Sequence, residues 1–331
     1  EPYAINRDLE VKDFLMSKTI DFKSFKDQVI FEKDEIVKDD GKPYVVYTPF
    51  SKAWKNKLNA YYLKPYPNSK YFNNFIKVDE KQELISLAEM GFEYKDFQFP
   101  ANETSVGIIK KYGETRDFPA IIGTSRLGLH YRFGTISIRE KAAKSLQLSE
   151  KYLNELIWRE FYMSILYHFP HVVESSFRKE YDAIEWRNNE NEFQLWCEGK
   201  TGYPIVDAGM RELNLTGYMH NRVRMIVASF LTKHLLIDWR WGEKYFAEKL
   251  LDFELASNNG GWQWAAGCGV DAAPYFRVFN PELQTEKFDP KEEYIKRWIP
   301  NYNKSTYIKP IVDHKYARNR VLEVYKAALK P

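Results

Sequence analysis

Cysteine and long apolar runs are both scarce in this 331-residue chain. The two cysteines, Cys197 and Cys268, are too few for a disulfide scaffold, and they lie in no CxxC pair of the kind that binds zinc. No apolar run approaches the roughly 20 residues that a membrane span needs. No signal peptide opens the sequence. We therefore expect a cytoplasmic protein with no metal site and no membrane partner.

The chain also lacks a large excess of charge of either sign. Lysine and arginine number 49 against 46 acidic residues, a net charge of +3 that does not by itself indicate nucleic acid. Aromatic residues are abundant instead, at 16% of the chain, which favours a large packed core, a site that stacks on a planar ligand, or both. The first residue is Glu1 rather than methionine, so we interpret the chain as a piece of a longer protein.

Helical periodicity dominates after about residue 105. Ser149 fits the cap of a helix that ends near Tyr167, and apolar residues repeat along one face of that helix. Gly217 is a typical helix stop, whereas Asn258–Gly261 predicts a turn or loop. Further helices are predicted over 205–213, 223–237 and 241–251.

The first hundred residues contain patterns typical of both helices and strands. Helices are predicted over 8–16 and 80–90, and two runs, 28–31 and 43–47, favour β-strands. We therefore predict three parts: the remnant of an α/β domain over 1–60, a linker over 61–104 and a mainly helical domain over 105–331.

Two segments carry groups suited to a nucleotide. Gly123–Gly128 can cradle a phosphate through backbone N–H groups, although a plain turn with a helix cap explains the same residues. Glu155, Trp158 and Arg159 share one helical face and can stack on and hydrogen-bond a planar base. A solvated face with a packed tryptophan is the alternative.

Two further segments fit a large aromatic ligand. Arg222 and Arg224 project to different sides of a helix, so one can face an internal ligand and the other face outward, or both can lie at the surface. Asp252 and Glu254 precede Asn258–Trp264, a combination that fits a cofactor site or a helix end beside a Trp-rich core. The sequence has no HExxH motif and no Ser/His/Asp pattern, which argues against hydrolase chemistry.

Seven motifs together resemble the photolyase/cryptochrome family, most closely the class I cyclobutane pyrimidine dimer photolyases of bacteria. They cover the chain to about residue 300 and are Thr124–Leu127, Trp158–Phe161, Lys200–Asp207, Met219–Arg222, Asn258–Trp264, Asp271–Arg277 and Phe279–Pro281. The resemblance implies a mainly α fold: an all-helical FAD-binding domain preceded by the remnant of a Rossmann-like α/β domain. Much of that α/β domain is absent from this sequence. Whether the native protein has the rest of it, and whether it binds the family's antenna pigment, are therefore open questions.

The resemblance also implies a cofactor site. Arg224 and Asp252 are expected to pair beside the flavin ring, and Asn258 to face the flavin N5. Gly128 stands where some relatives carry Ser, and Glu254 where many carry Asp. The implied FAD contacts are Tyr112, Thr124, Ser125, Arg126, Leu127, Glu155, Arg159, Asn221, Arg224, Asp252, Glu254 and Asn258.

The remaining implied residues serve the substrate. The pocket for a dimer flipped out of the duplex is implied to consist of Glu155, Trp158, Asn221, Met225 and Trp264. The electron-transfer chain is implied to be Trp262, Trp239 and Trp186, and the DNA-backbone contacts Arg116, Arg159, Arg222 and Arg277.

The function that the resemblance implies is a carbon–carbon lyase: blue light drives an electron from FAD to a cyclobutane dimer in UV-damaged DNA. We expect such an enzyme to act as a monomer. Two alternatives stay open at this point. One is a cryptochrome-type blue-light photoreceptor that binds FAD without repair, and the other is an inactive fragment.

Overall fold

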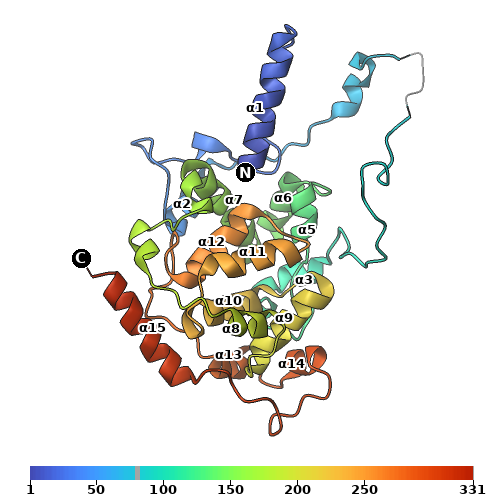
Figure 1. Ribbon diagram of the computed structural model, residues 1–331. Helices are drawn as coiled ribbons and strands as arrows, with labels where there is room; N and C mark the ends of the chain where they lie inside the picture. The colour runs from blue at the N-terminus through green and yellow to red at the C-terminus, as the bar shows by residue number, and fades with distance from the viewer. Residues whose placement is uncertain (79–82, 331) are drawn as a thin grey trace.

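Regular structure in this chain is helical. The computed structural model describes residues 1–78 and 83–330 (Figure 1). Within those residues lie fifteen α-helices, and the β-pairing there is a single bridge between Val37 and Pro43. No helix of the described part is both long and apolar enough to cross a membrane.

The helical body follows residue 105, as the sequence predicts. Its α-helices are α3 (Val106–Lys110), α4 (Tyr112–Thr115), α5 (Gly128–Phe133), α6 (Ile138–Leu148), α7 (Glu150–His168), α8 (Glu190–Cys197), α9 (Pro204–Thr216), α10 (Asn221–Ser229), α11 (Trp239–Lys249), α12 (Leu255–Ala266), α13 (Pro281–Phe288), α14 (Glu293–Trp298) and α15 (His314–Ala328). Short 3-10 helices cover Pro170–Val173 and Lys179–Ala183, and a π-helix, η5 (Phe230–His234), continues α10.

Local signals correctly predict the start of α7 and the end of α9. The Ser149 side chain accepts a hydrogen bond from the Tyr152 N–H at the start of α7. Gly217 ends α9 with φ of 63°. Glycine adopts this left-handed conformation without a Cβ clash. The predicted helix over 223–237 is present as α10 and its π-helical continuation, which ends at His234.

The turn predicted at Asn258–Gly261 is wrong, because these residues lie inside α12. Glu254 caps that helix by accepting hydrogen bonds from the Ala256 and Ser257 N–H groups, both at 2.9 Å. A Cβ on Gly260 would lie 2.2 Å from Tyr162 Cδ1. The glycine therefore allows α7 and α12 to approach closely.

The N-terminal part is mostly irregular. It contains α1 (Pro2–Ser17), α2 (Tyr47–Lys57) and two 3-10 helices, Lys33–Glu35 and Asn68–Asn74. The helix predicted over 8–16 is present within α1, which buries none of its residues and projects away from the body (Figure 1). Of the helix predicted over 80–90, residues 80–82 lie outside the described residues and 83–90 are not helical.

The strands predicted over 28–31 and 43–47 are wrong. Apart from the bridge at Pro43, neither run pairs with another strand among the described residues. Ile30 and Phe31 instead donate their backbone N–H groups to the Glu160 carboxylate, at 2.7 and 2.9 Å. Tyr47 is already the first residue of α2.

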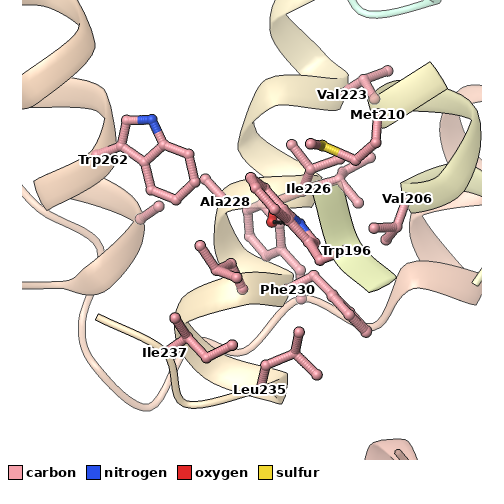
Figure 2. Close-up of a cluster of buried hydrophobic side chains, with 14 of the residues drawn as sticks. Trp196, Val206, Met210, Val223, Ile226, Ala228, Phe230, Leu235, Ile237 and Trp262 are labelled. Atoms are coloured by element: carbon pink, nitrogen blue, oxygen red, sulfur yellow. Dashed lines mark hydrogen bonds between the residues drawn. The ribbon is translucent and has the colours of Figure 1, made fainter. Parts of the chain in front are cut away.

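Two buried clusters form the core. The larger one contains residues of all helices from α8 through α12 and of α15. Figure 2 shows its centre, where Trp196, Ile226 and Phe230 pack together. The smaller one joins the N-terminal segment to α7, with Phe50 and Trp54 each 1% exposed. The N-terminal residues are thus part of the packing of the helical body, and the predicted domain boundaries stay a prediction.

A buried carboxylate ties the N-terminal segment to α7. Glu160 is 3% exposed and accepts hydrogen bonds from Ile30 N, Phe31 N and, at 2.6 Å, Trp54 Nε1. Burial raises the pKa of this carboxyl to about 7, although the three donors oppose that shift. The carboxylate satisfies three N–H groups that would otherwise be buried without partners.

Replacing this carboxylate should destabilise the fold. At pH 8 we expect Glu160→Gln to lower the free energy of unfolding by about 1–3 kcal/mol, because its NH₂ group faces N–H donors. Denaturant unfolding followed by circular dichroism measures the change. The control is Glu323→Gln, at an exposed position of α15. This surface substitution should stay within about 0.5 kcal/mol of wild type. Equal effects of the two substitutions would contradict the role assigned to Glu160.

Candidate functional site

One face each of α7, α10 and α12 meets at a cavity of about 480 Å³. Such a volume is typical of ligand pockets. The helical repeat explains the convergence, since residues three or four apart share a face. The lining residues are Glu155, Trp158, Arg159 and Tyr162 of α7, then Asn221, Arg222, Arg224, Met225 and Ala228 of α10, and Ser257, Asn258, Gly261, Trp262 and Trp264 of α12. The lining also includes Tyr112, Arg116, Asp117, Thr124, Phe246, Leu250, Asp252, Phe253 and Glu254.

The ion pair predicted between Arg224 and Asp252 is present. Arg224 Nη2 donates to both carboxylate oxygens of Asp252, at 3.1 and 2.9 Å, and its Nε donates to the Met219 carbonyl at 2.7 Å. Burial disfavours the charge of Arg224, but the Asp252 carboxylate outweighs that effect and raises the pKa of Arg224. The pair therefore stays charged inside the cavity wall.

Gly128 gives Asp252 the room for this pair. A Cβ at position 128 would lie 2.8 Å from Asp252 Oδ2 and 3.1 Å from its Cβ. Any larger residue at position 128 would meet this carboxylate in the present arrangement. The glycine is therefore matched to the position of Asp252.

A second ion pair joins Arg116 and Glu155, whose side chains are 35% and 31% exposed. Burial raises the pKa of Glu155, and the charge of Arg116 opposes that shift. The residues predicted to contact the DNA backbone and the lesion edge are thus partners of each other in this structure. A ligand that engages either one competes for this pair.

Three more predicted residues have contacts within the chain. Asn258 Nδ2 donates to the backbone carbonyl and to Oε1 of Glu243, at 3.0 and 2.8 Å, which fixes its amide against α11. The Glu254 carboxylate caps α12. Arg159 Nη1 donates to the Gln28 carbonyl at 2.6 Å and so holds the N-terminal segment as well as lining the cavity.

The Thr124–Leu127 segment is only partly at this cavity. Thr124 lines it, whereas Leu127 is 1% exposed within the core and Ser125 Oγ accepts a hydrogen bond from the Tyr152 hydroxyl. Arg126 lines a second cavity of about 410 Å³, with its guanidinium 4.7 Å from the Tyr218 ring centroid. Asp252 lines both cavities, so the two adjoin at this residue.

Comparisons with known proteins identify the family. The FAD binding domain of DNA photolyase matches residues 152–305, and DNA photolyase matches residues 1–70. A deoxyribodipyrimidine photo-lyase of Vibrio cholerae is 39% identical, over 97% of this chain and 76% of that protein. The chain belongs to the DNA photolyase family.

Solved photolyases share the fold. The bacterial class III photolyase of Agrobacterium tumefaciens superimposes with a TM-score of 0.83 at 35% identity, over all of this chain and 78% of that one. The archaeal photolyase of Sulfolobus tokodaii, solved with two FAD molecules, gives 0.78 at 36% identity, over 98% and 76% of the two chains. The fold predicted from the motifs is thus confirmed as photolyase-like and mainly helical.

The tryptophans predicted for electron transfer belong to the larger core cluster of this photolyase family member. Trp262 lines the cavity and packs edge-on against Phe246 and Trp196, with ring centroids 5.0 and 6.0 Å apart. Trp239 is 1% exposed, and Trp186 is half-buried against that cluster. Their roles in electron transfer stay a prediction.

The four arginines predicted for DNA differ in their surroundings. Arg116 and Arg159 have the contacts described above, and Arg222 donates to Asp117 Oδ1 at 2.7 Å with its guanidinium over the Phe288 ring. Arg277 is exposed, away from the cavity lining. Arg222 and Arg224 both line the cavity, so the expectation that one of them faces outward is wrong.

Several lining residues were not among the predicted site residues. Tyr162 carries a signal in the sequence, because it continues the α7 face of Glu155, Trp158 and Arg159. Asp117, which pairs with Arg222, and Phe253 stand in no recognisable pattern.

His220 serves the structure of α10 rather than acting as a cavity residue. Its Nδ1 accepts a hydrogen bond from the Arg222 N–H at 3.1 Å. This bond caps the helix and requires the neutral ring. Burial lowers the pKa of His220 to about 4, and the charge of Arg224 acts in the same direction. These contacts are those of a hydrogen-bonded structural residue.

Acid should weaken this cap. The unfolded chain protonates His220 near pH 6.5 and the folded one only near 4, so between these values the unfolded state binds the extra proton. The stability that depends on the neutral ring is present above pH 6.5 and is lost as the pH falls to 4, by up to about 3 kcal/mol. Asn caps helices without titrating, so His220→Asn should reduce that loss in denaturant unfolding at pH 7 and pH 4.5. Parallel pH profiles would contradict this assignment.

Gly242 of α11 sets the position of Trp262. A Cβ there would lie 2.1 Å from Trp262 Cη2, whereas a Cβ on Gly261 would meet no atom within 4 Å. We expect Gly242→Ala to lower the free energy of unfolding by about 1–3 kcal/mol through overpacking. Gly261→Ala, the matched control, should be neutral or stabilising by roughly 0.5–1 kcal/mol, because alanine favours the helix. Denaturant unfolding compares the two, and a neutral Gly242→Ala would show that Trp262 is free to move.

Proposed function

We propose that this chain is a light-driven, FAD-dependent DNA repair enzyme that splits cyclobutane pyrimidine dimers. The observation that carries the proposal is the single cavity that gathers Trp158, Trp264, Asn258 and the Arg224–Asp252 pair. Its relatives that are named deoxyribodipyrimidine photo-lyases support the same function.

The residues present fit a bound FAD. Two cavities, one of about 480 Å³ and one of about 410 Å³, share the Asp252 wall. This arrangement suits a ligand made of two joined halves. Arg222 Nε is buried without a hydrogen-bond partner, and Arg126 forms no ion pair among the described side chains, so both can serve phosphate oxygens. When bound in its reduced form and illuminated, FAD supplies the electron that opens the cyclobutane ring and takes it back afterwards.

The chain's own residues would bind and orient the cofactor. The Arg224–Asp252 pair presents a charge-balanced wall. The Asn258 amide, held by Glu243, adds no negative charge beside an anionic flavin. Trp262, 2% exposed, would close the inner end of the cavity and keep water out.

The lesion would enter between aromatic faces. A flipped-out dimer leaves the duplex at a lower cost than a normal base, because it is already poorly stacked. Trp158 and Trp264 would stack on it, and Met225 would pack against it. Glu155, at the cavity wall, would hydrogen-bond the base edge of the dimer.

Repair in solution tests the proposal. Purified protein, reconstituted with FAD and a reductant, is mixed with an oligonucleotide carrying one thymine dimer and illuminated with blue light. Recovery of thymine absorbance only in the light would establish repair. A bound flavin without recovery would favour the cryptochrome-type photoreceptor, and no bound flavin would favour an inactive fragment.

The ion pair provides a variant with a defined effect. Asp252→Asn leaves the buried Arg224 charge uncompensated, so we expect FAD affinity to fall by roughly tenfold or more. Met225→Ala, at a residue assigned to the dimer alone, should keep FAD and lose dimer affinity, which separates the two binding steps. Flavin absorbance after gel filtration measures retention, with Glu323→Gln as the control. Normal FAD retention by Asp252→Asn would contradict the role of this pair.

A further inference from the structure

Trp158 is stacked face to face on Tyr47. The ring centroids are 3.7 Å apart and the planes differ by 3°. Tyr47 begins α2 in the N-terminal segment and is not among the residues that line the cavity, whereas Trp158 is. Tyr47 therefore covers a face of Trp158 from outside the cavity.

Several contacts keep Tyr47 in place. Its hydroxyl donates to the Asn154 carbonyl at 3.0 Å, one turn before Trp158 on α7. Burial raises the pKa of this phenol to about 12, so it stays a donor over the whole working range of pH. Its ring also meets Phe161 edge-on, with centroids 6.0 Å apart.

The helix that carries Tyr47 is itself anchored. Phe50 packs on Phe161 with ring centroids 5.2 Å apart, and Trp54 donates to the buried Glu160. Together with the Asn154 contact, these two contacts fix α2 to α7 on both sides of Trp158 along the helix. The Trp158 plane is held by a rigid partner rather than by a mobile loop.

We infer that Tyr47 is a positioning residue for dimer recognition: it fixes the plane of the Trp158 ring that faces the cavity. This inference rests on the proposed function, in which Trp158 stacks on the dimer. A ring that is already held loses less side-chain freedom when a ligand stacks on it, so the stack favours binding without touching the lesion. The recognised ligand is the fused pyrimidine pair, a surface suited to a flat aromatic wall.

Substitutions at Tyr47 separate its ring from its hydroxyl. Tyr47→Leu removes the flat partner and keeps apolar bulk, whereas Tyr47→Phe keeps the stack. Tyr44→Leu is the matched control, because Tyr44 belongs to the same segment and its ring meets Phe50 rather than Trp158. From the strength of aromatic stacking, we expect Tyr47→Leu to lose roughly three- to tenfold in dimer affinity relative to undamaged DNA.

Two measurements decide the inference. The first is the ratio of affinities for oligonucleotides with and without one thymine dimer, together with FAD content. The second is the fluorine resonance of Trp158 in protein labelled with 5-fluorotryptophan, assigned through Trp158→Phe. We expect Tyr47→Leu to lower the ratio and shift or broaden that resonance at unchanged FAD content. Tyr47→Phe and Tyr44→Leu should match wild type.

The outcomes that overturn the inference are distinct. An unchanged ratio and resonance in Tyr47→Leu would do so, as would equal losses for dimer, undamaged DNA and FAD, which indicate a general structural role. If Tyr47→Leu does not fold, Tyr47→Met takes its place with the same expectations. If wild type itself does not distinguish the dimer, the proposed function fails and the inference fails with it. A failure of the inference alone leaves wild-type discrimination intact.

Discussion

The buried Glu160 carboxylate is the contact on which the arrangement of the site depends. Its three N–H donors come from the N-terminal segment, and the residue itself lies on α7 between Arg159 and Tyr162. One face of α7 therefore anchors that segment while the adjacent face lines the cavity. Arg159 serves both, because it holds the Gln28 carbonyl and also lines the cavity.

The cavity contains many charged side chains, and their charges nearly balance. Four arginines and four carboxylates line it, and Arg224–Asp252, Arg116–Glu155 and Arg222–Asp117 account for most of them as ion pairs. A ligand that enters meets paired groups rather than bare charges. Binding is then an exchange of partners, in which phosphate or base oxygens replace carboxylates on the same arginines. Selectivity follows from which ligands can make that exchange without leaving a buried charge unpaired.

Local signals predict the helices well and the long-range contacts poorly. The caps at Ser149 and Gly217 act within a turn or two of chain, so the sequence shows them directly. The strand-favouring runs fail because β-propensity needs a partner strand, and Ile30 finds a carboxylate instead. The family motifs predict the Arg224–Asp252 pair, but no motif marks Tyr47, which meets Trp158 from a distant part of the chain.

The anchor has a consequence for how the chain folds as it is made. The Glu160 contacts with Ile30, Phe31 and Trp54 span 130, 129 and 106 residues. At roughly 5–20 residues per second, the N-terminal segment is synthesised about 5–25 s before its acceptor. During that interval its aromatic side chains and N–H groups have no native partner. Their exposure therefore ends only when α7 is complete. Chaperones that bind nascent chains would contribute most to folding before that point.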